Sequence, residues 1–270
     1  MKHLLLVILA AFAVAALPAA AQNRIFVNHA ATGAATGASW ADAFADLQAA
    51  LVLAQAGDEV WVAQGTYRPT SGTDRGQSFE PKSGIRLLGG FAGTETDSSQ
   101  RSWEVHPTVL SGDIGATADS TDNSYNVVFL FEPDSATVFD GFTVLGGNAD
   151  YSGLSTSRDR RKCGGGMYIM GEDAEAYPFV RNCRFVRNTA RNSGGGVCIN
   201  GGGDGSIAPL FFNCRFENNR SLGNGGGLAY LGASWIERGI EIDSCAFLRN
   251  IAGNRGGGLV YQDAERFDTI

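Results

Sequence analysis

One pattern dominates the sequence between Cys163 and Tyr261 and returns every 30 or 31 positions. Triplets of consecutive glycines recur in this register, with their first glycines at positions 164, 194, 225 and 256. Between the triplets a cysteine (183, 214, 245), a phenylalanine (185, 216, 247) and an asparagine (188, 219, 250) each recur at a constant step. Landmarks repeated at one fixed period indicate a solenoid or another array in which each repeat packs on its neighbours.

The glycine triplets exclude a helical repeat, because three consecutive glycines in every unit would break its helices. The segments between the triplets instead alternate: Cys183 and Phe185 fall on one face of an extended chain, and Arg184 falls on the other. A period of two predicts short, half-buried strands. A second short strand is predicted directly after each triplet, at 167–169, 197–199, 228–230 and 259–261.

Equivalent side chains should lie on top of one another, since parallel strands in register are about 4.8 Å apart. We therefore expect an internal stack of the three phenylalanines and a column of the three cysteines beside it. The asparagines should form a hydrogen-bonded ladder where the chain leaves the strand, and tolerate a left-handed bend there. Glycine allows the backbone to turn at the opposite corner. These expectations describe an all-β protein, a parallel β-helix.

The repeats also resemble known protein groups. Phe185-x-x-Asn188 and its two copies alternate with Gly-Gly-Gly-Met/Val/Leu, and this is similar to the F-x-x-N and G-G-[A/G]-[I/L/V] repeats of polymorphic outer-membrane proteins. The chain resembles, more widely, secreted bacterial parallel β-helix proteins of the pectate-lyase-like superfamily, loosely over 24–270 and well over 139–261. The resemblance implies a right-handed β-helix. It selects no function, because that superfamily includes lyases, hydrolases, adhesins and passive surface proteins.

The N-terminal segment 1–21 has the organisation of a secretory signal peptide. Lys2 and His3 precede an apolar segment, and Ala19-Ala20-Ala21 provides a small-residue cleavage site. A transmembrane anchor would need about 20 apolar residues, and Pro18 interrupts this segment. We predict a chain that is secreted or displayed at the cell surface, with no membrane span after the signal is cleaved.

Residues 22–57 are predicted to form an N-terminal strand, at 24–28, and an amphipathic capping helix. Ser39 is expected to begin the helix, and Gly57 to follow its end. Such a helix would cover the open end of the solenoid. Its apolar stripe would consist of Trp40, Phe44, Leu47 and Leu51.

Residues 58–270 are assigned to the β-helix, and the regular repeats begin at 163. The first strands are expected near Val60, Ile85 and Val109, a closer spacing that predicts shorter coils. The connection at 150–163 is eleven positions longer than its equivalents and is expected to protrude from the wall. The sequence ends partway into another turn, so we expect a truncated copy of a longer protein.

The loop at 150–163 is the main candidate for a binding site. Its residues either contact an acidic sugar or a phosphate, or form a solvated loop in which the basic side chains bind nothing. If a site exists, these side chains should meet acids from the preceding turns. The candidate ligand-contacting residues are Tyr151, Arg158, Arg160, Arg161 and Lys162.

The sequence assigns no catalytic residue, cofactor or metal ligand. Ca²⁺ is an option for a lyase on such a fold, but no motif supports it. Aspartates in turns usually bond to their own backbone, and this is expected for Asp113, Asp119, Asp122, Asp134, Asp140 and Asp150. The five cysteines lack the spacing of zinc ligands. Because three of them share one inward position, we predict free thiols.

Two functions from different classes are compatible with these features. The first is a non-enzymatic extracellular or cell-surface β-helix, structural or adhesin-like, that contacts polysaccharide or another surface protein. The second is a polysaccharide lyase or glycosidase acting on an acidic polysaccharide. Uniform repeats favour the first, since an enzyme needs acids and bases that converge on one wall. A formal net charge of −7, or −8 without Lys2, disfavours nucleic acid as a partner. The ligand and the oligomeric state stay open.

Overall fold

The computed structural model describes residues 23–117, 119–171, 177–201, 207–232, 239–262 and 267–269. The predicted signal peptide lies outside the described residues. Within them, one α-helix and two short 3-10 helices accompany four β-sheets. No helix in this part of the chain is long and apolar enough to cross a membrane.

The strands of each sheet follow one another along the stack. Sheet A contains β1 (Arg24–Val27), β2 (Glu59–Ala63), β4 (Arg86–Phe91), β7 (Val138–Asp140), β11 (Phe179–Arg181), β15 (Leu210–Phe212) and β19 (Glu241–Asp243). Sheet B contains β3 (Gly65–Tyr67), β5 (Thr108–Ser111), β8 (Phe142–Leu145), β12 (Arg184–Val186), β16 (Arg215–Glu217) and β20 (Ala246–Leu248). Sheet C contains β6 (Val128–Phe131), β10 (Met167–Gly171), β14 (Val197–Gly201), β18 (Leu228–Leu231), β22 (Leu259–Gln262) and β23 (Phe267–Thr269). Sheet D contains β9 (Asn148–Ala149), β13 (Thr189–Ala190), β17 (Arg220–Ser221) and β21 (Ile251–Ala252).

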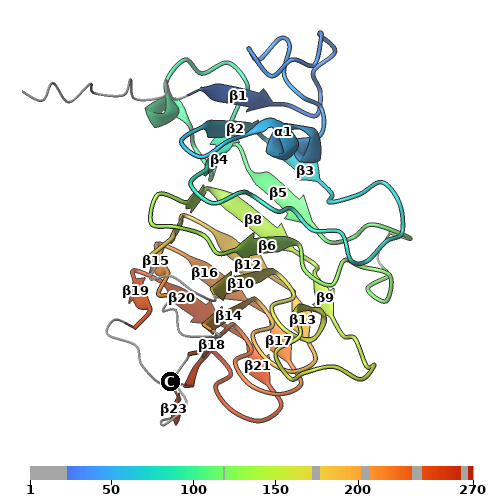
Figure 1. The fold of residues 1–270 in the computed structure, drawn as a ribbon, viewed down its shortest axis with the longest axis vertical. Coiled ribbons are helices and arrows are strands. Elements are labelled where there is room, and N and C mark those ends of the chain that lie inside the picture. Colours follow the sequence, from blue (N-terminus) through green and yellow to red (C-terminus); the bar gives the residue numbers. More distant parts are fainter. Residues whose placement is uncertain are drawn as a thin grey trace, which may run out of the picture.

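One repeat of the sequence visits all four sheets in turn, through β11, β12, β13 and β14, before β15 returns to sheet A. Neighbouring strands in the described sheets are parallel, except that β23 is antiparallel to β22. Figure 1 shows the strands stacked along the long axis, from blue β1 at one end to the red strands at the other. The prediction of an all-β chain of parallel, stacked repeats is confirmed.

The predicted internal stacks are present. The ring of Phe216 lies 5.2 Å from that of Phe185 and 4.5 Å from that of Phe247, with interplanar angles of 14° and 4°. Cys183 and Cys214 are buried in the same core, and Cys245 packs against it. All five cysteines lie within the described residues and are unpaired in this structure. The register of the repeats therefore determines which side chains stack in the core.

The asparagine ladder is also confirmed, but the left-handed bend is not at the asparagines. The side-chain oxygen of Asn219 accepts from the Asn188 backbone and side chain, at 3.0 and 3.1 Å, and Asn250 does the same for Asn219. Positive φ values fall instead one residue earlier, at Arg187, Asn218 and Arg249. Others fall at the preceding corner, at Asn182, Asn213 and Ser244. The asparagine side chains of the ladder point inward, and the residue before each asparagine adopts the left-handed conformation at the bend.

The N-terminal helix is much shorter than predicted. α1 (Leu47–Leu53) begins after Asp46, whose side chain accepts from the Gln48 N–H. The expected start at Ser39 is wrong, because Phe44 pairs its backbone with β1: its N–H donates to Phe26 and its carbonyl accepts from Asn28. This pairing covers the edge of β1 in place of a longer helix. Leu47, Ala50 and Leu51 are buried in the core, and α1 contacts β1 and β2.

The early turns are irregular in a way that spacing does not predict. The strands near Val60 and Ile85 are neighbours in sheet A, as β2 and β4. The strand at Val109 is not their next neighbour, because it is β5 of sheet B and pairs with β3 and β8. β4 pairs directly with β7. A short 3-10 helix, η1 (Ser98–Gln100), precedes the turn that carries Trp103.

Candidate functional site

The predicted loop returns to the wall of the solenoid and protrudes only in part. Residues 154–157 are exposed, but Lys162 and Cys163 are buried. The 3-10 helix η2 (Arg160–Lys162) forms the returning segment. The side-chain amide of Asn126 holds its base by donating to the carbonyls of Arg160, Cys163 and Gly164, at 3.0, 2.8 and 2.7 Å.

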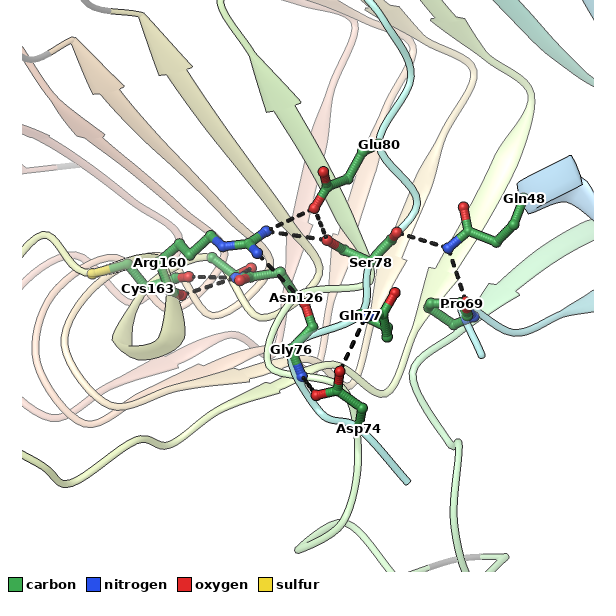
Figure 2. A network of polar contacts seen from close by, with 11 residues as sticks. Gln48, Pro69, Asp74, Gly76, Gln77, Ser78, Glu80, Asn126, Arg160 and Cys163 are labelled. Atoms are coloured by element: carbon green, nitrogen blue, oxygen red, sulfur yellow. Dashed lines mark hydrogen bonds and ion pairs between the residues drawn. The ribbon is translucent and has the colours of Figure 1, made fainter. Parts of the chain in front are cut away.

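Arg160 is the predicted basic residue that meets an acid from a preceding turn. Its Nη1 donates to Glu80 Oε1 at 3.1 Å and to Ser78 Oγ at 3.2 Å, and Ser78 donates to the same carboxylate at 2.8 Å (Figure 2). The guanidinium also lies 4.5 Å from the centre of the Phe129 ring. Glu80 is bound on one side and open on the other, with 53% of its side chain exposed.

A cleft of about 680 Å³ adjoins this ion pair. Gln48, from α1, closes one side by donating to the carbonyls of Pro69 and Ser78, at 2.8 and 2.9 Å (Figure 2). Lys82 Nζ donates to the carbonyls of Val52 and Ala54 at the end of α1. The polar groups of this cleft therefore hold the loop, the helix and the 69–82 segment together, and most of their hydrogen bonds are used internally.

The other predicted residues do not gather into one basic cluster. Arg161 binds Asp159 and lies over the Tyr151 ring, with its guanidinium carbon 3.9 Å from the ring centre. Lys162 is 9% exposed, and its Nζ donates to the Ser155 carbonyl at 3.4 Å. Arg158 points to sheet C, where Nη1 donates to Asn200 Oδ1 at 3.2 Å. The loop is a fastened structural element rather than a free patch of positive charge.

Acid should loosen this loop. Hydrogen bonds from the Arg161 side chain, together with its backbone N–H, lower the pKa of Asp159 to about 2 from 3.8. A folded pKa below the unfolded one means that the pairing stabilises the fold above about pH 4 and is lost as the pH falls towards 2. We expect Asp159→Asn to be roughly 1–2 kcal/mol less stable than the wild type at pH 6 and about equal to it near pH 2. Denaturant melts across this range test the prediction; a constant difference would contradict it.

A second concave surface lies on the outer face of sheet B. It is a groove of about 430 Å³ whose walls come from the turn before β5 and from the corners and strands of three successive repeats. Its lining residues are Trp103, Glu104, Pro107, Thr143, Asn182, Cys183, Arg184, Asn213 and Arg215. Arg184 and Arg215 are register partners on β12 and β16, and just over half of each side chain is exposed.

Hydrogen bonds pre-order the groove. Glu217 accepts from Arg184 at 3.3 Å and from Arg215 at 2.5 Å, which lets two guanidinium groups share one carboxylate. Contacts with these arginines, against the opposing effect of burial, lower the pKa of Glu217, so it stays ionised. Along the corner, Asn213 donates to Asn182 Oδ1 and Asn182 donates to Asp140 Oδ1, both at 2.8 Å. The groove presents an aromatic ring, amides and two guanidinium groups, beside the carboxylates of Glu104 and Glu217.

The groove belongs to a basic wall in a chain whose net charge is negative. In the described residues from 177 to 262 there are eight arginines and three acids, Glu217, Glu241 and Asp243, although the whole chain carries −7. Seven of these arginines are exposed: Arg184, Arg187, Arg191, Arg215, Arg220, Arg249 and Arg255. They lie on or beside sheets B and D, so positive potential follows the stack.

Three of the six aspartates behave as expected from their turns. Asp119, Asp122 and Asp134 accept from nearby backbone N–H groups. Asp140 instead is fully buried between Arg101, Arg181 and Asn182. Asp113 and Asp150 face Arg68 and Arg75. The described residues contain no group of three or more His, Cys, Asp or Glu side chains placed to hold a metal ion.

Sequence reasoning placed Arg184 and Arg215 on the outer face but did not identify the groove. Trp103 and Glu104 lie some eighty residues earlier, in a connection with no repeat signature. Comparison with protein-family models, with curated proteins and with solved structures finds no match. The proposed function therefore rests on the geometry of the chain itself.

Proposed function

We propose that this chain is an exported, right-handed parallel β-helix that binds acidic polysaccharide along its sheet B wall without cleaving it. The observation that carries the proposal is the groove that Arg184 and Arg215, which are in register, line together with Trp103. Guanidinium groups bind carboxylates and sulfates through paired, charge-assisted hydrogen bonds. An indole ring offers an apolar face against which a sugar ring can pack.

The repeat geometry suits an extended polymer better than a small molecule. Register partners are about 4.8 Å apart along the stack, so Arg184 and Arg215 offer two guanidinium groups on adjacent rungs. Their neighbours in the register are Thr143 and Ala246. The exposed side chains of Arg184, Asn213 and Arg215 contribute to the groove. The signal-like N-terminus and the resemblance to secreted β-helix proteins support an extracellular polysaccharide, in a surface or adhesin-like role, as its partner.

A non-enzymatic role is favoured by how the acids are held. Glu217 is committed to two arginines, and Asp140 is buried between two more. Two carboxylates flanking one scissile bond are what a glycosidase needs, and in the groove Glu104 is the acid that contributes to the lining. The arrangement of described residues therefore supports binding rather than hydrolysis.

A charge-matched pair of double variants tests the groove. We expect R184Q/R215Q to bind polygalacturonate at least about tenfold more weakly than the wild type, because two charge-assisted contacts are lost. R191Q/R220Q removes the same charge from residues that do not line the groove, and should change affinity by less than about twofold. Affinity is measured by titration calorimetry at fixed ionic strength.

Two controls separate specific binding from its alternatives. Fully methyl-esterified polygalacturonate, which lacks the charge, should bind weakly to all three proteins. Equal losses of affinity in both double variants would show that the binding is non-specific electrostatic attraction, and would contradict the proposal that the groove is the binding site. Release of unsaturated or reducing ends from polygalacturonate, with or without Ca²⁺, would establish the lyase or glycosidase alternative.

A further inference from the structure

The outer face of sheet C carries a second cluster of apolar side chains, separate from the main core and beneath the loop at 150–163. Cys163, Tyr168, Cys198 and Leu231 are buried there. Cys163 ends the loop, and its backbone forms a bridge with Ser193, five residues before Cys198 in β14. Two cysteines that are 35 positions apart in the sequence are thus brought together outside the inward column.

These two cysteines pack in the same buried cluster. The Cys163 thiol donates to the Ser157 carbonyl at 3.3 Å. A Cβ placed on Gly164, the next residue, would lie 3.1 Å from the Cβ of Cys198. The backbone beside Cys163 therefore approaches Cys198 closely, and disulfides join cysteines whose Cβ atoms are about 3.5–4.5 Å apart.

We propose that Cys163 and Cys198 form a disulfide bond under oxidising conditions, which fastens the 150–163 loop to β14. The setting rests on the proposed export, because disulfides form and persist outside the reducing cytoplasm. Cys183, Cys214 and Cys245 do not join in. They occupy one register position in successive turns, where neighbouring strands are about 4.8 Å apart and their Cβ vectors run parallel, an unfavourable geometry for a bridge.

The expectation of five free thiols came from the inward register, and the structure shows that this register includes three of the five cysteines. Each bridging thiol gives up a proton, the two sulfurs form one S–S bond, and two electrons pass to an external disulfide, which becomes two thiols. Oxidised glutathione or an exported thiol–disulfide oxidoreductase supplies that acceptor. Burial raises the pKa of Cys198, so the bond should form while the loop is closing rather than afterwards.

The bridge would secure a loop that already has polar fastenings. Tyr168 Oη donates to the Arg158 carbonyl at 2.6 Å and accepts from Asn200 Nδ2 at 3.0 Å beside the two cysteines. Cross-linking Cys163 to Cys198 restricts the unfolded chain, and it also prevents the loop from leaving sheet C. We therefore expect the oxidised protein to melt about 5–10 °C above the reduced one.

The experiment uses the full chain, refolded with oxidised and reduced glutathione, then denatured and alkylated with N-ethylmaleimide without reductant. Intact mass should show three labels on the five cysteines, and peptide mapping should join the Cys163 and Cys198 peptides. Cys183→Ala, the matched control, should keep that bridge, whereas Cys163→Ala and Cys198→Ala should each carry four labels and lose the difference in melting temperature. Having two bridge-breaking variants keeps the test decisive if one of them folds poorly.

Five labels on the wild-type protein, or a bridge that includes Cys183, Cys214 or Cys245, would overturn the proposal. The refolding experiment does not depend on where a cell places the chain or on what the groove binds. Its failure is therefore distinct from a failure of the polysaccharide-binding experiment.

Discussion

Replacing Phe216 with alanine is expected to lower the free energy of unfolding by about 3–5 kcal/mol. Phe216 is fully buried, stacks on Phe185 and Phe247, and meets the edge of Phe211 at 5.9 Å. Truncation removes the middle ring of a column, and the rungs on both sides keep their backbone positions because the strands pair along the whole sheet. The cavity can therefore collapse only partly, and its cost adds to the lost burial.

Arg215 provides the matched control for this prediction. It precedes Phe216 on β16, but its side chain is 53% exposed and shares Glu217 with Arg184. Exposed ion pairs contribute little, so Arg215→Ala should change stability by no more than about 0.5 kcal/mol. Urea melts of both variants measure the difference. Equal losses at the two positions would show that the inward and outward faces of the strand have been assigned wrongly.

The sequence was sufficient to predict the stacks because the repeat itself encodes the register. A residue and its copy in the next repeat occupy equivalent places in adjacent rungs, so Phe185, Phe216 and Phe247 had to meet once the strands were parallel. The positive φ at the first glycine of each triplet follows similarly, at Gly164 and its three copies. In these repeats the spacing of residues along the sequence therefore also determines which side chains meet in the structure.

Features without a repeat were not predictable in this way. The stripe from Trp40 to Leu51 fits a helix, yet the backbone of Phe44 was needed at the edge of β1, and a tertiary hydrogen bond outweighs helix propensity. Arg160 binds Glu80 across eighty residues, and Trp103 lines the same groove as Arg184 across a similar separation. Such pairings depend on which irregular turn lies beside which strand, and the spacing of residues along the sequence does not predict that arrangement.

Replacing Asp140 with alanine is also expected to lower the free energy of unfolding by about 3–5 kcal/mol, in this case for an electrostatic reason. Asp140 is fully buried and pairs with Arg101 and with Arg181 Nε, the latter at 2.5 Å, while its Oδ1 accepts from Asn182 at 2.8 Å. The Arg101 side chain is itself 8% exposed. Removing the carboxylate leaves that guanidinium in the interior, where the Gly89 carbonyl remains as a partner without opposite charge.

Asp243 is the control, because it lies in the same column of sheet A as Asp140, by way of Arg181 and Phe212. It is exposed, so Asp243→Ala should change stability by no more than about 0.5 kcal/mol. A second comparison isolates the charge: Arg101→Leu combined with Asp140→Leu should be less destabilised than the sum of the two single variants, since neither charge is then left unpaired.

The Asp140 prediction also links the core to the proposed groove. Asn182 lines the groove and depends on Asp140, and Arg101 lies 5.3 Å from the centre of the Trp103 ring on the groove wall. Asp140→Asn keeps the shape of the side chain but removes its charge. We therefore expect this variant to fold with a moderately lower free energy of unfolding. It should bind polygalacturonate several-fold more weakly, because Asn182 and, through Arg101, Trp103 are no longer held by a buried carboxylate. Calorimetry on the folded variant measures this, and an unchanged affinity would show that the groove does not depend on the buried carboxylate.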